Sequence, residues 1–182
     1  ESYVGSIVGS MVLGASILAM GGFDFNFVLL PLLIASAGIV VSIIGTFMVS
    51  VKEGGDPQKA LNRGEFGSSI IMVAAIYFLI QEFLPAEFVQ GGVVFYSMGV
   101  FYATIIGLAA GLGIGMITEH YTGTGTSPVK SITDQSVTGA ATNIIAGLGV
   151  GMQSTAIPTL IIAAAIIGAY HFSGLYGIAV AA

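Results

Sequence analysis

The ionisable side chains of this chain are few, and their spacing limits the chemistry that they could perform. The 182 residues contain nine carboxylates, four Lys or Arg and two His. No cluster of closely spaced carboxylates is available to hold a hard cation such as Mg²⁺. Cysteine is absent, so neither a disulfide framework nor a thiolate metal site is expected. The sequence therefore assigns no catalytic residue and leaves any metal ligands unknown.

The richest group of charges lies in residues 52–65, which hold three of the four basic residues. This segment could bind an anionic substrate, but such a cluster is more often a solvated loop, and we favour the loop. Asp56 and Pro57 are typical of an N-cap followed by proline at the first helical position, so we predict a helix that begins there. The net charge of −5 is too thinly spread to indicate a nucleic-acid partner.

The elements that carry these groups are predicted to be membrane helices. Charged residues make up 7% of the chain and hydrophobic ones 55%, whereas a soluble domain has about 25% charged residues. Residues 135–182 contain no Asp, Glu, Lys or Arg, and a charge-free apolar run beyond about 20 residues is typical of a membrane span. Because both ends of the chain lie inside apolar patterns, we expect it to be a piece of a larger protein.

Breaks rich in glycine, proline and charge divide the chain into spans. We predict an all-α fold: a polytopic transmembrane helix bundle with five complete spans and the start of a sixth. Pro31 lies near the start of the second span and is tolerable there because the first helical turn lacks internal N–H partners. The fifth span is expected to be the longest. A break is expected at residues 171–174. The predicted spans are 1–22, 27–51, 57–84, 90–119, 135–170 and 174–182.

The basic residues also predict an orientation. All four lie in residues 52–65 and 119–134, whereas the alternate loops, 22–26, 81–92 and 171–174, contain none. The positive-inside rule places the two basic loops in the cytoplasm.

Glycine spacing indicates packing rather than nucleotide binding. Gly5 and Gly9 form a small-xxx-small step, which lets another helix approach closely in lipid. Residues 111–116 and 147–152 both follow a Gly-x-Gly-x-Gly-Met pattern. A dinucleotide fingerprint would need a preceding strand and a different spacing. We therefore predict that both hexads lie on surfaces that face another helix.

Several motifs in series resemble those of the membrane-bound, ion-pumping inorganic pyrophosphatases, and the resemblance covers essentially the entire chain. Taken singly each motif is weak, but their order is specific. They are Glu1-Ser-Tyr-Val-Gly5, Asp56-Pro-Gln-Lys-Ala-Leu61, Thr118-Glu-His-Tyr-Thr122 with Ser127-Pro-Val129, the run from Thr138 to Pro158, and the run from Gly174 to Ala182.

The resemblance implies a homodimeric pump in a lipid bilayer. Such a pump hydrolyses pyrophosphate on the cytoplasmic side with Mg²⁺ and moves Na⁺ or H⁺ outward. The full-length protein would be an ion-translocating inorganic diphosphatase in the inner membrane of a prokaryotic cell. The acidic segments that hold Mg²⁺ and pyrophosphate in the family are not in this chain, which alone lacks the hydrolytic site. K⁺ and Na⁺ are further expected cofactors, and the K⁺ dependence is not predicted.

Glu1 and Ser2 resemble the family's ion gate, where an Asp-Leu-Phe tripeptide usually precedes the Glu. An acidic group at the bilayer centre costs about 2.5 kcal/mol or more, so such groups usually serve ion pathways. A Glu followed by Ser resembles the Na⁺-pumping members, and we expect Na⁺ rather than H⁺, with Glu1 as ligand and Ser2 as helper. The alternatives are a terminal charge with no role and, for the protein, a secondary transporter or channel segment with no hydrolytic activity, or a purely structural membrane domain.

Overall fold

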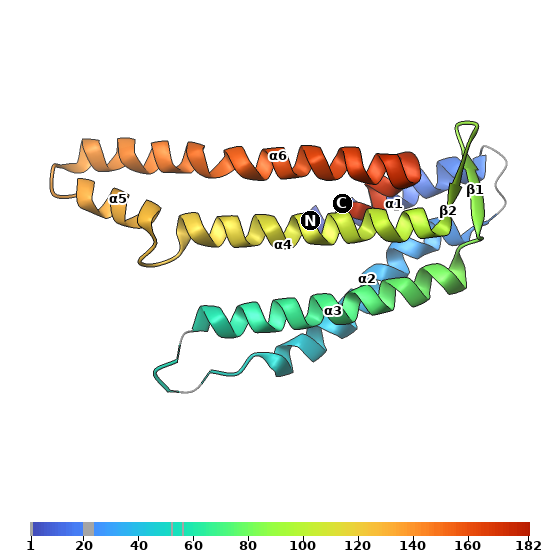
Figure 1. Cartoon of the computed structure of the whole chain (residues 1–182), viewed down its shortest axis with the longest axis horizontal. Helices are drawn as coiled ribbons and strands as arrows, with labels where there is room; N and C mark the ends of the chain where they lie inside the picture. Colours follow the sequence, from blue (N-terminus) through green and yellow to red (C-terminus); the bar gives the residue numbers. More distant parts are fainter. Residues whose placement is uncertain (1, 20–23, 52, 56) are drawn as a thin grey trace. The chain divides into compact units, whose positions relative to one another are not determined.

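The computed structural model describes residues 2–19, 24–51, 53–55 and 57–182. The chain forms two compact units, which are described separately. Unit 1 comprises the residues up to Ile105 together with Ala169–Ala182, and unit 2 comprises Ile106–Gly168. The elements shown in Figure 1 are α1 (Ser2–Ala19), α2 (Asn26–Met48), α3 (Pro57–Phe83), β1 (Glu87–Gln90), β2 (Val93–Tyr96), α4 (Ser97–Thr122), α5 (Ser127–Gln135) and α6 (Ala140–Ala181).

In unit 1, α2 packs against both α1 and α3. Small residues allow the close approach of α2 and α3: a Cβ placed on Gly45 would lie 3.0 Å from the Ser68 Cβ, and one on Gly64 would lie 2.5 Å from the Val49 Cγ2. Close backbone approach of this kind is the usual basis of helix association in lipid. α3 begins at Pro57, which confirms the predicted helix start, although Asp56 lies outside the described residues.

Residues 87–96 form an antiparallel hairpin instead of the helix that the sequence predicted from residue 90. The register pairs Glu87 with Tyr96 and Gln90 with Val93. Gly91 and Gly92 take φ angles of 60° and 82°, which a two-residue hairpin turn with positive φ at both positions requires. β-branched and aromatic residues on both sides of the turn favour strands. The prediction of an exclusively helical chain was therefore wrong here, and α4 begins only at Ser97.

Unit 2 contains the second part of α4, all of α5 and most of α6. The α4 and α6 parts lie alongside each other, because Ile106 reaches Gly168 and Ile161 reaches Gly113. The polar segment predicted at 119–134 is largely helical: α4 continues to Thr122, and α5 begins at Ser127. Residues 134 and 135 belong to α5, so the long helix starts at Ala140 rather than at 135.

The helix α6 is broken near its end. Ser173 (φ −151°, ψ 25°) and Gly174 (φ 60°, ψ −149°) have non-helical dihedral angles, and helical backbone resumes after them. This confirms the predicted break at residues 171–174 and the start of another helix near Gly174. Pro158 lies inside the helical run before the break.

Within the residues that the structure describes, four helical stretches are long and apolar enough to cross a membrane: Asn26–Met48, Pro57–Phe83, Ser97–Gln135 and Ala140–Ala181. A shorter apolar helix occupies Tyr3–Ile17. The helical, membrane-spanning class predicted from composition is thus confirmed.

Candidate functional site

The predicted gate residues stand at the start of α1. Glu1 lies outside the described residues, so its surroundings stay a prediction. Ser2 is the first residue of α1, and its side chain also lies outside what the structure describes. The structure describes the contacts that α1 makes between Tyr3 and Ile17, in the helix that begins at the predicted gate.

No second site for a cation is found elsewhere in the described part of the chain. Within the ranges 2–19, 24–51, 53–55 and 57–182, no group of three or more His, Asp or Glu residues could hold a metal ion. The described carboxylates, from Asp24 to Asp134, are scattered over different helices and loops, and none is buried.

Ser10, Gly14 and Tyr3 of α1 contact neighbouring segments. The Ser10 hydroxyl is buried and donates to the carbonyl of Ala179 at 2.5 Å, beyond the break in α6. Gly14 packs directly on the backbone of Phe27 at the start of α2: a Cβ there would lie 2.8 Å from the Phe27 carbonyl carbon. The Tyr3 hydroxyl reaches the Ala35 carbonyl at 3.5 Å, a weaker contact. Ser10 and Gly14 lie one turn apart, so they attach one face of α1.

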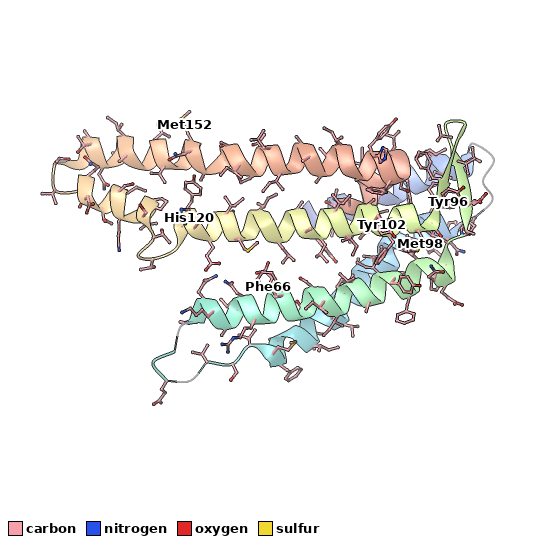
Figure 2. The ribbon with its side chains drawn as sticks, in the orientation of Figure 1. Phe66, Tyr96, Met98, Tyr102, His120 and Met152 are labelled. Atoms are coloured by element: carbon pink, nitrogen blue, oxygen red, sulfur yellow. The ribbon has the colours of Figure 1, made fainter. Side chains whose placement is uncertain are left out.

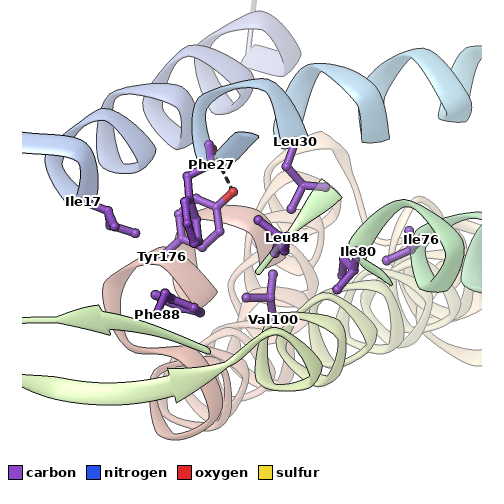
Figure 3. Close-up of a cluster of buried hydrophobic side chains, with 9 residues drawn as sticks. All are labelled: Ile17, Phe27, Leu30, Ile76, Ile80, Leu84, Phe88, Val100 and Tyr176. Atoms are coloured by element: carbon purple, nitrogen blue, oxygen red, sulfur yellow. Dashed lines mark hydrogen bonds between the residues drawn. The ribbon is translucent and has the colours of Figure 1, made fainter. Parts of the chain in front are cut away.

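Phe27, on whose backbone Gly14 packs, belongs to a buried cluster of unit 1. The cluster joins Ile17 of α1, Phe27 and Leu30 of α2, Ile76 and Ile80 of α3, Leu84, Phe88 of β1, Val100 of α4 and Tyr176 near the end of α6 (Figure 3). Its centre is Tyr176, which is fully buried and donates its hydroxyl hydrogen to the Phe27 carbonyl at 2.8 Å. The Tyr176 ring meets the Phe27 ring edge-on at a centroid distance of 5.3 Å, and Phe88 of the hairpin lies 4.9 Å from Phe27. We call Gly14, Phe27, Phe88 and Tyr176 the Tyr176 junction. Each aromatic pair contributes about 0.5–1.5 kcal/mol beyond the area it buries.

The break in α6 turns the end of the chain, which carries Tyr176, so that it packs against α4 and against the part of α6 before the break. A Cβ on Gly177 would lie 2.6 Å from the Ala169 carbonyl oxygen and 3.2 Å from the Ala103 Cβ. Gly99 of α4 packs on the Phe172 carbonyl, and the Tyr102 ring, labelled in Figure 2, lies 5.5 Å from that of Phe172. Glycine is needed at these positions because an added Cβ would overlap atoms of the neighbouring segment.

The Ser10, Gly14 and Tyr176 contacts were not predicted from the sequence. A tyrosine within a charge-free run was an available signal, because a buried Tyr hydroxyl usually finds a hydrogen-bond partner. The partner itself could not be found, since Tyr176 and Phe27 are 149 positions apart.

The glycine hexads have few neighbours among the described residues. A Cβ on Gly147, Gly149 or Gly151 would meet nothing within 4 Å, and one on Gly113 would only reach the end of Ile161 at 4.0 Å. Met152, the last residue of the second hexad and labelled in Figure 2, is 71% exposed. Gly5 and Gly9 of α1 are equally open. Among these glycines, Gly113 approaches α6 through Ile161, and the packing of the others against another helix stays a prediction.

The turn before α6 is held by polar contacts within unit 2. The hydroxyl groups of Thr138 and Thr142 lie 2.6 Å apart, and Thr142 also donates to the Gly139 carbonyl at 2.9 Å. The Asn143 Oδ1 is buried without a hydrogen-bond partner. His120, labelled in Figure 2, stands near the end of α4 and contacts only the adjacent Tyr121 ring at 5.4 Å among the ring pairs described. These contacts shape a turn and assemble no reactive group.

The long apolar helices and the scarcity of charge define the chain as a segment of a multi-pass integral membrane protein. A family profile described as "Inorganic H+ pyrophosphatase" matches residues 1–182. The chain therefore belongs to the inorganic H⁺ pyrophosphatase family, as the resemblance of its motifs implied.

Curated relatives are similar over the whole chain. The "K(+)-insensitive pyrophosphate-energized proton pump 2" of Moorella thermoacetica is 39% identical over 189 residues, and a protein of Methanosarcina mazei named "K(+)-insensitive pyrophosphate-energized proton pump" is also 39% identical over 189 residues. A Clostridium tetani protein, provisionally named a K(+)-stimulated pyrophosphate-energized sodium pump, is 38% identical over 190 residues. Each match covers 100% of this chain but 26% of the relative, so the chain spans about a quarter of their length.

Proposed function

We propose that the protein to which this chain belongs is an integral-membrane inorganic pyrophosphatase that couples cytoplasmic pyrophosphate hydrolysis to outward pumping of Na⁺ or H⁺. The family match over residues 1–182 is the observation that carries the proposal. This segment would supply membrane helices and the ion gate. Mg²⁺ and pyrophosphate would bind outside it, which agrees with the lack of a metal-binding cluster among the described residues.

The test is transport by the full-length protein in inverted membrane vesicles. Addition of Mg²⁺ and pyrophosphate should drive ion uptake, and hydrolysis and uptake should stop together when pyrophosphate is omitted or replaced by a non-hydrolysable diphosphonate. Ion movement that needs no pyrophosphate would contradict the proposal and would favour a secondary transporter or channel.

For the pumped ion we propose Na⁺, with Glu1 as ligand and Ser2 as helper. The names of the relatives include proton pumps and a sodium pump, as well as K⁺-insensitive and K⁺-stimulated proteins, so they do not select an ion. The Glu1→Gln protein should lose pyrophosphate-driven ²²Na⁺ uptake, because the neutral amide is a poorer ligand for a hard cation than a carboxylate. Glu87→Gln on the exposed hairpin is the matched control. Undiminished Na⁺ uptake by Glu1→Gln would rule out the assignment.

For the architecture we propose five complete spans and the start of a sixth, with α1 as the first and the helix after Gly174 as the last. The four long apolar helices and the shorter Tyr3–Ile17 helix support this count. Residues 52–65 and 119–134 would face the cytoplasm, and the hairpin would face the opposite side. A cysteine at Gly91 should react with an impermeant maleimide from outside the cell, and a cysteine at Gly125 should react only in inverted vesicles. Labelling of both from one side would contradict this topology.

We also propose a homodimer in which part of residues 135–170 meets its symmetry mate. The support is that Gly147 and Gly151, which lie one turn apart on one face of α6, have no atom within 4 Å of an added Cβ, so a second helix could approach closely there. Single cysteines at these positions should form intersubunit disulfides in the full-length protein. Cysteine at Val89, exposed on the hairpin, is the control. The absence of crosslinks along the glycine face would exclude this interface.

A further inference from the structure

We propose that the Tyr176 hydroxyl replaces the backbone N–H that Pro31 lacks, and that it thereby positions α1, the helix that begins at the proposed ion gate. Tyr176 is then a positioning residue for ion coupling. Only the transport part of this inference rests on the proposed function, because the hydrogen-bond replacement can be tested by stability alone.

The first step concerns the place of Pro31 in α2. The helix begins at Asn26 with Phe25 as its N-cap, and the Leu29 N–H already donates to the Phe25 carbonyl at 3.2 Å. Pro31 therefore lies beyond the first turn, whereas the sequence had indicated a place where no donor was needed. Because proline has no N–H, the carbonyl four residues earlier, that of Phe27, loses its usual helical donor.

The second step is the donor that reaches this carbonyl. The Tyr176 hydroxyl donates to the Phe27 carbonyl oxygen at 2.8 Å, inside a cluster where both residues are buried (Figure 3). Because both residues are buried, water cannot take over this contact, and an unsatisfied buried backbone carbonyl carries a large penalty. The rings of Phe27 and Phe88, centred 5.3 Å and 6.3 Å from that of Tyr176, hold the phenol in place.

The third step connects the same carbonyl to α1. Gly14 lies against it so closely that a Cβ would come 2.8 Å from the Phe27 carbonyl carbon and 3.2 Å from the Val28 nitrogen. One turn earlier in α1, Ser10 donates to the Ala179 carbonyl at 2.5 Å, in the segment that carries Tyr176. The short helix after the break therefore contacts α1 directly through Ala179. Its Tyr176 also donates a hydrogen bond to the Phe27 carbonyl, against which Gly14 of α1 packs.

The fourth step is mechanical. From Gly14 to Ser2 is about 18 Å of helix at 1.5 Å per residue, so a small rotation at the Tyr176 junction becomes a larger displacement at the start of α1. A junction with fixed geometry keeps that end in place while the pump cycles. Loss of the Tyr176 hydroxyl should loosen α1 and allow hydrolysis without transport.

The experiment is a double-mutant cycle in the full-length protein: parent, Tyr176→Phe, Pro31→Ala and the double variant. Tyr176→Phe should increase the rate of thermal inactivation about fivefold, the effect of one lost buried hydrogen bond. Pro31→Ala restores an N–H four residues after Phe27. In that background, Tyr176→Phe should change the inactivation rate less than about twofold. Pro31→Leu, which restores the N–H and retains apolar volume, serves if Pro31→Ala cannot be purified.

The transport readout is the ratio of ions moved to pyrophosphate hydrolysed in vesicles. A merely structural loss of folded protein lowers both quantities and leaves the ratio unchanged. We expect Tyr176→Phe to lower the ratio at least about twofold and Pro31→Ala to restore it in the double variant. Tyr77→Phe, at a partly exposed position of α3, is the control and should change neither readout.

An equal stability loss from Tyr176→Phe in both backgrounds would overturn the replacement of the Pro31 donor. An unchanged ion ratio in a destabilised Tyr176→Phe protein would overturn the positioning role. If the proposed function itself is wrong, the parent protein will show no pyrophosphate-driven transport, and the stability cycle will still test the hydrogen bond.

Discussion

The glycines of the two units look alike in the sequence but have opposite surroundings. In unit 1, Gly14, Gly99 and Gly177 each press against backbone atoms of another segment. In unit 2, Gly147, Gly149 and Gly151 of α6 meet nothing within 4 Å, although they form the more regular pattern. Since lipid gives no hydrophobic drive for helix association, the packed glycines mark where unit 1 is held together. The open ones mark a surface that this chain leaves uncovered.

The difference shows that spacing alone does not reveal whether a membrane glycine is packed. Gly14 is packed because the start of α2 passes over it, and Gly177 because the break at Ser173 and Gly174 turns the chain back toward Ala169. Both arrangements depend on contacts between distant residues. Alanine substitutions compare the two environments directly, because each adds one methyl group and the same gain in helix propensity.

The largest effect is expected at Gly14. Gly14→Ala would place a methyl group against the Phe27 carbonyl, where the atoms are backbone and cannot rotate away, so we expect a loss of about 3 kcal/mol of stability. The measurement is thermal unfolding of the full-length protein in detergent. Gly9→Ala on the same helix, where nothing lies within 4 Å, is the matched control. Equal unfolding midpoints for the two variants would contradict the packing of Gly14.

The second-largest effect is expected for Gly177→Ala, which should lower the stability by about 2 kcal/mol. The new Cβ would lie 2.6 Å from the Ala169 carbonyl oxygen and 2.8 Å from the Ser173 Cβ, so the turn after the break must open. Gly168→Ala is the comparison, because there the Cβ meets only the flexible end of Ile106 at 3.2 Å. Denaturant unfolding monitored by tyrosine fluorescence should separate the two variants, and a larger loss at Gly168 would reverse the expected ranking.

Gly174→Ala should cost about 1–2 kcal/mol, because φ 60° with ψ −149° lies in a region that essentially only glycine adopts. The close approach of the Gln90 Oε1 at 2.5 Å and of the Phe95 ring at 3.1 Å adds to this cost. Gly92→Ala in the hairpin turn has φ 82° and no atom within 4 Å, so it isolates the backbone contribution. The difference between the two midpoints measures the packing at the break. A greater cost at Gly92 than at Gly174 would show that the break is not tightly packed.

The smallest effect is expected at Gly149. Gly149→Ala meets open space and should raise stability by up to about 1 kcal/mol through helix propensity. The measurement is the unfolding midpoint together with the oligomeric state in detergent. A destabilised Gly149→Ala protein would show that another part of the proposed pump covers this face, which would confirm the packing role that the sequence indicated.

Much of the helical organisation could be predicted because charge and turn residues interrupt long apolar runs. Pro57 marked the start of α3, and His171 to Gly174 marked the break in α6. The hairpin was missed because Val93 to Tyr96 are as apolar as the helix that follows, and only the Gly91–Gly92 pair indicated a turn. The contacts of the Tyr176 junction join segments that are far apart in the sequence, and the spacing of apolar residues does not predict such pairings. The surroundings of Glu1 stay a prediction, since they lie outside the described residues.

The β1–β2 hairpin also affects how the chain can enter the bilayer. Two helices joined by unpaired polypeptide would expose a run of peptide groups that must cross an apolar layer during insertion. Pairing from Glu87 with Tyr96 to Gln90 with Val93 lets the connection satisfy many of its own peptide groups, and this reduces the cost of translocation. The same pairing keeps the end of α3 close to the start of α4.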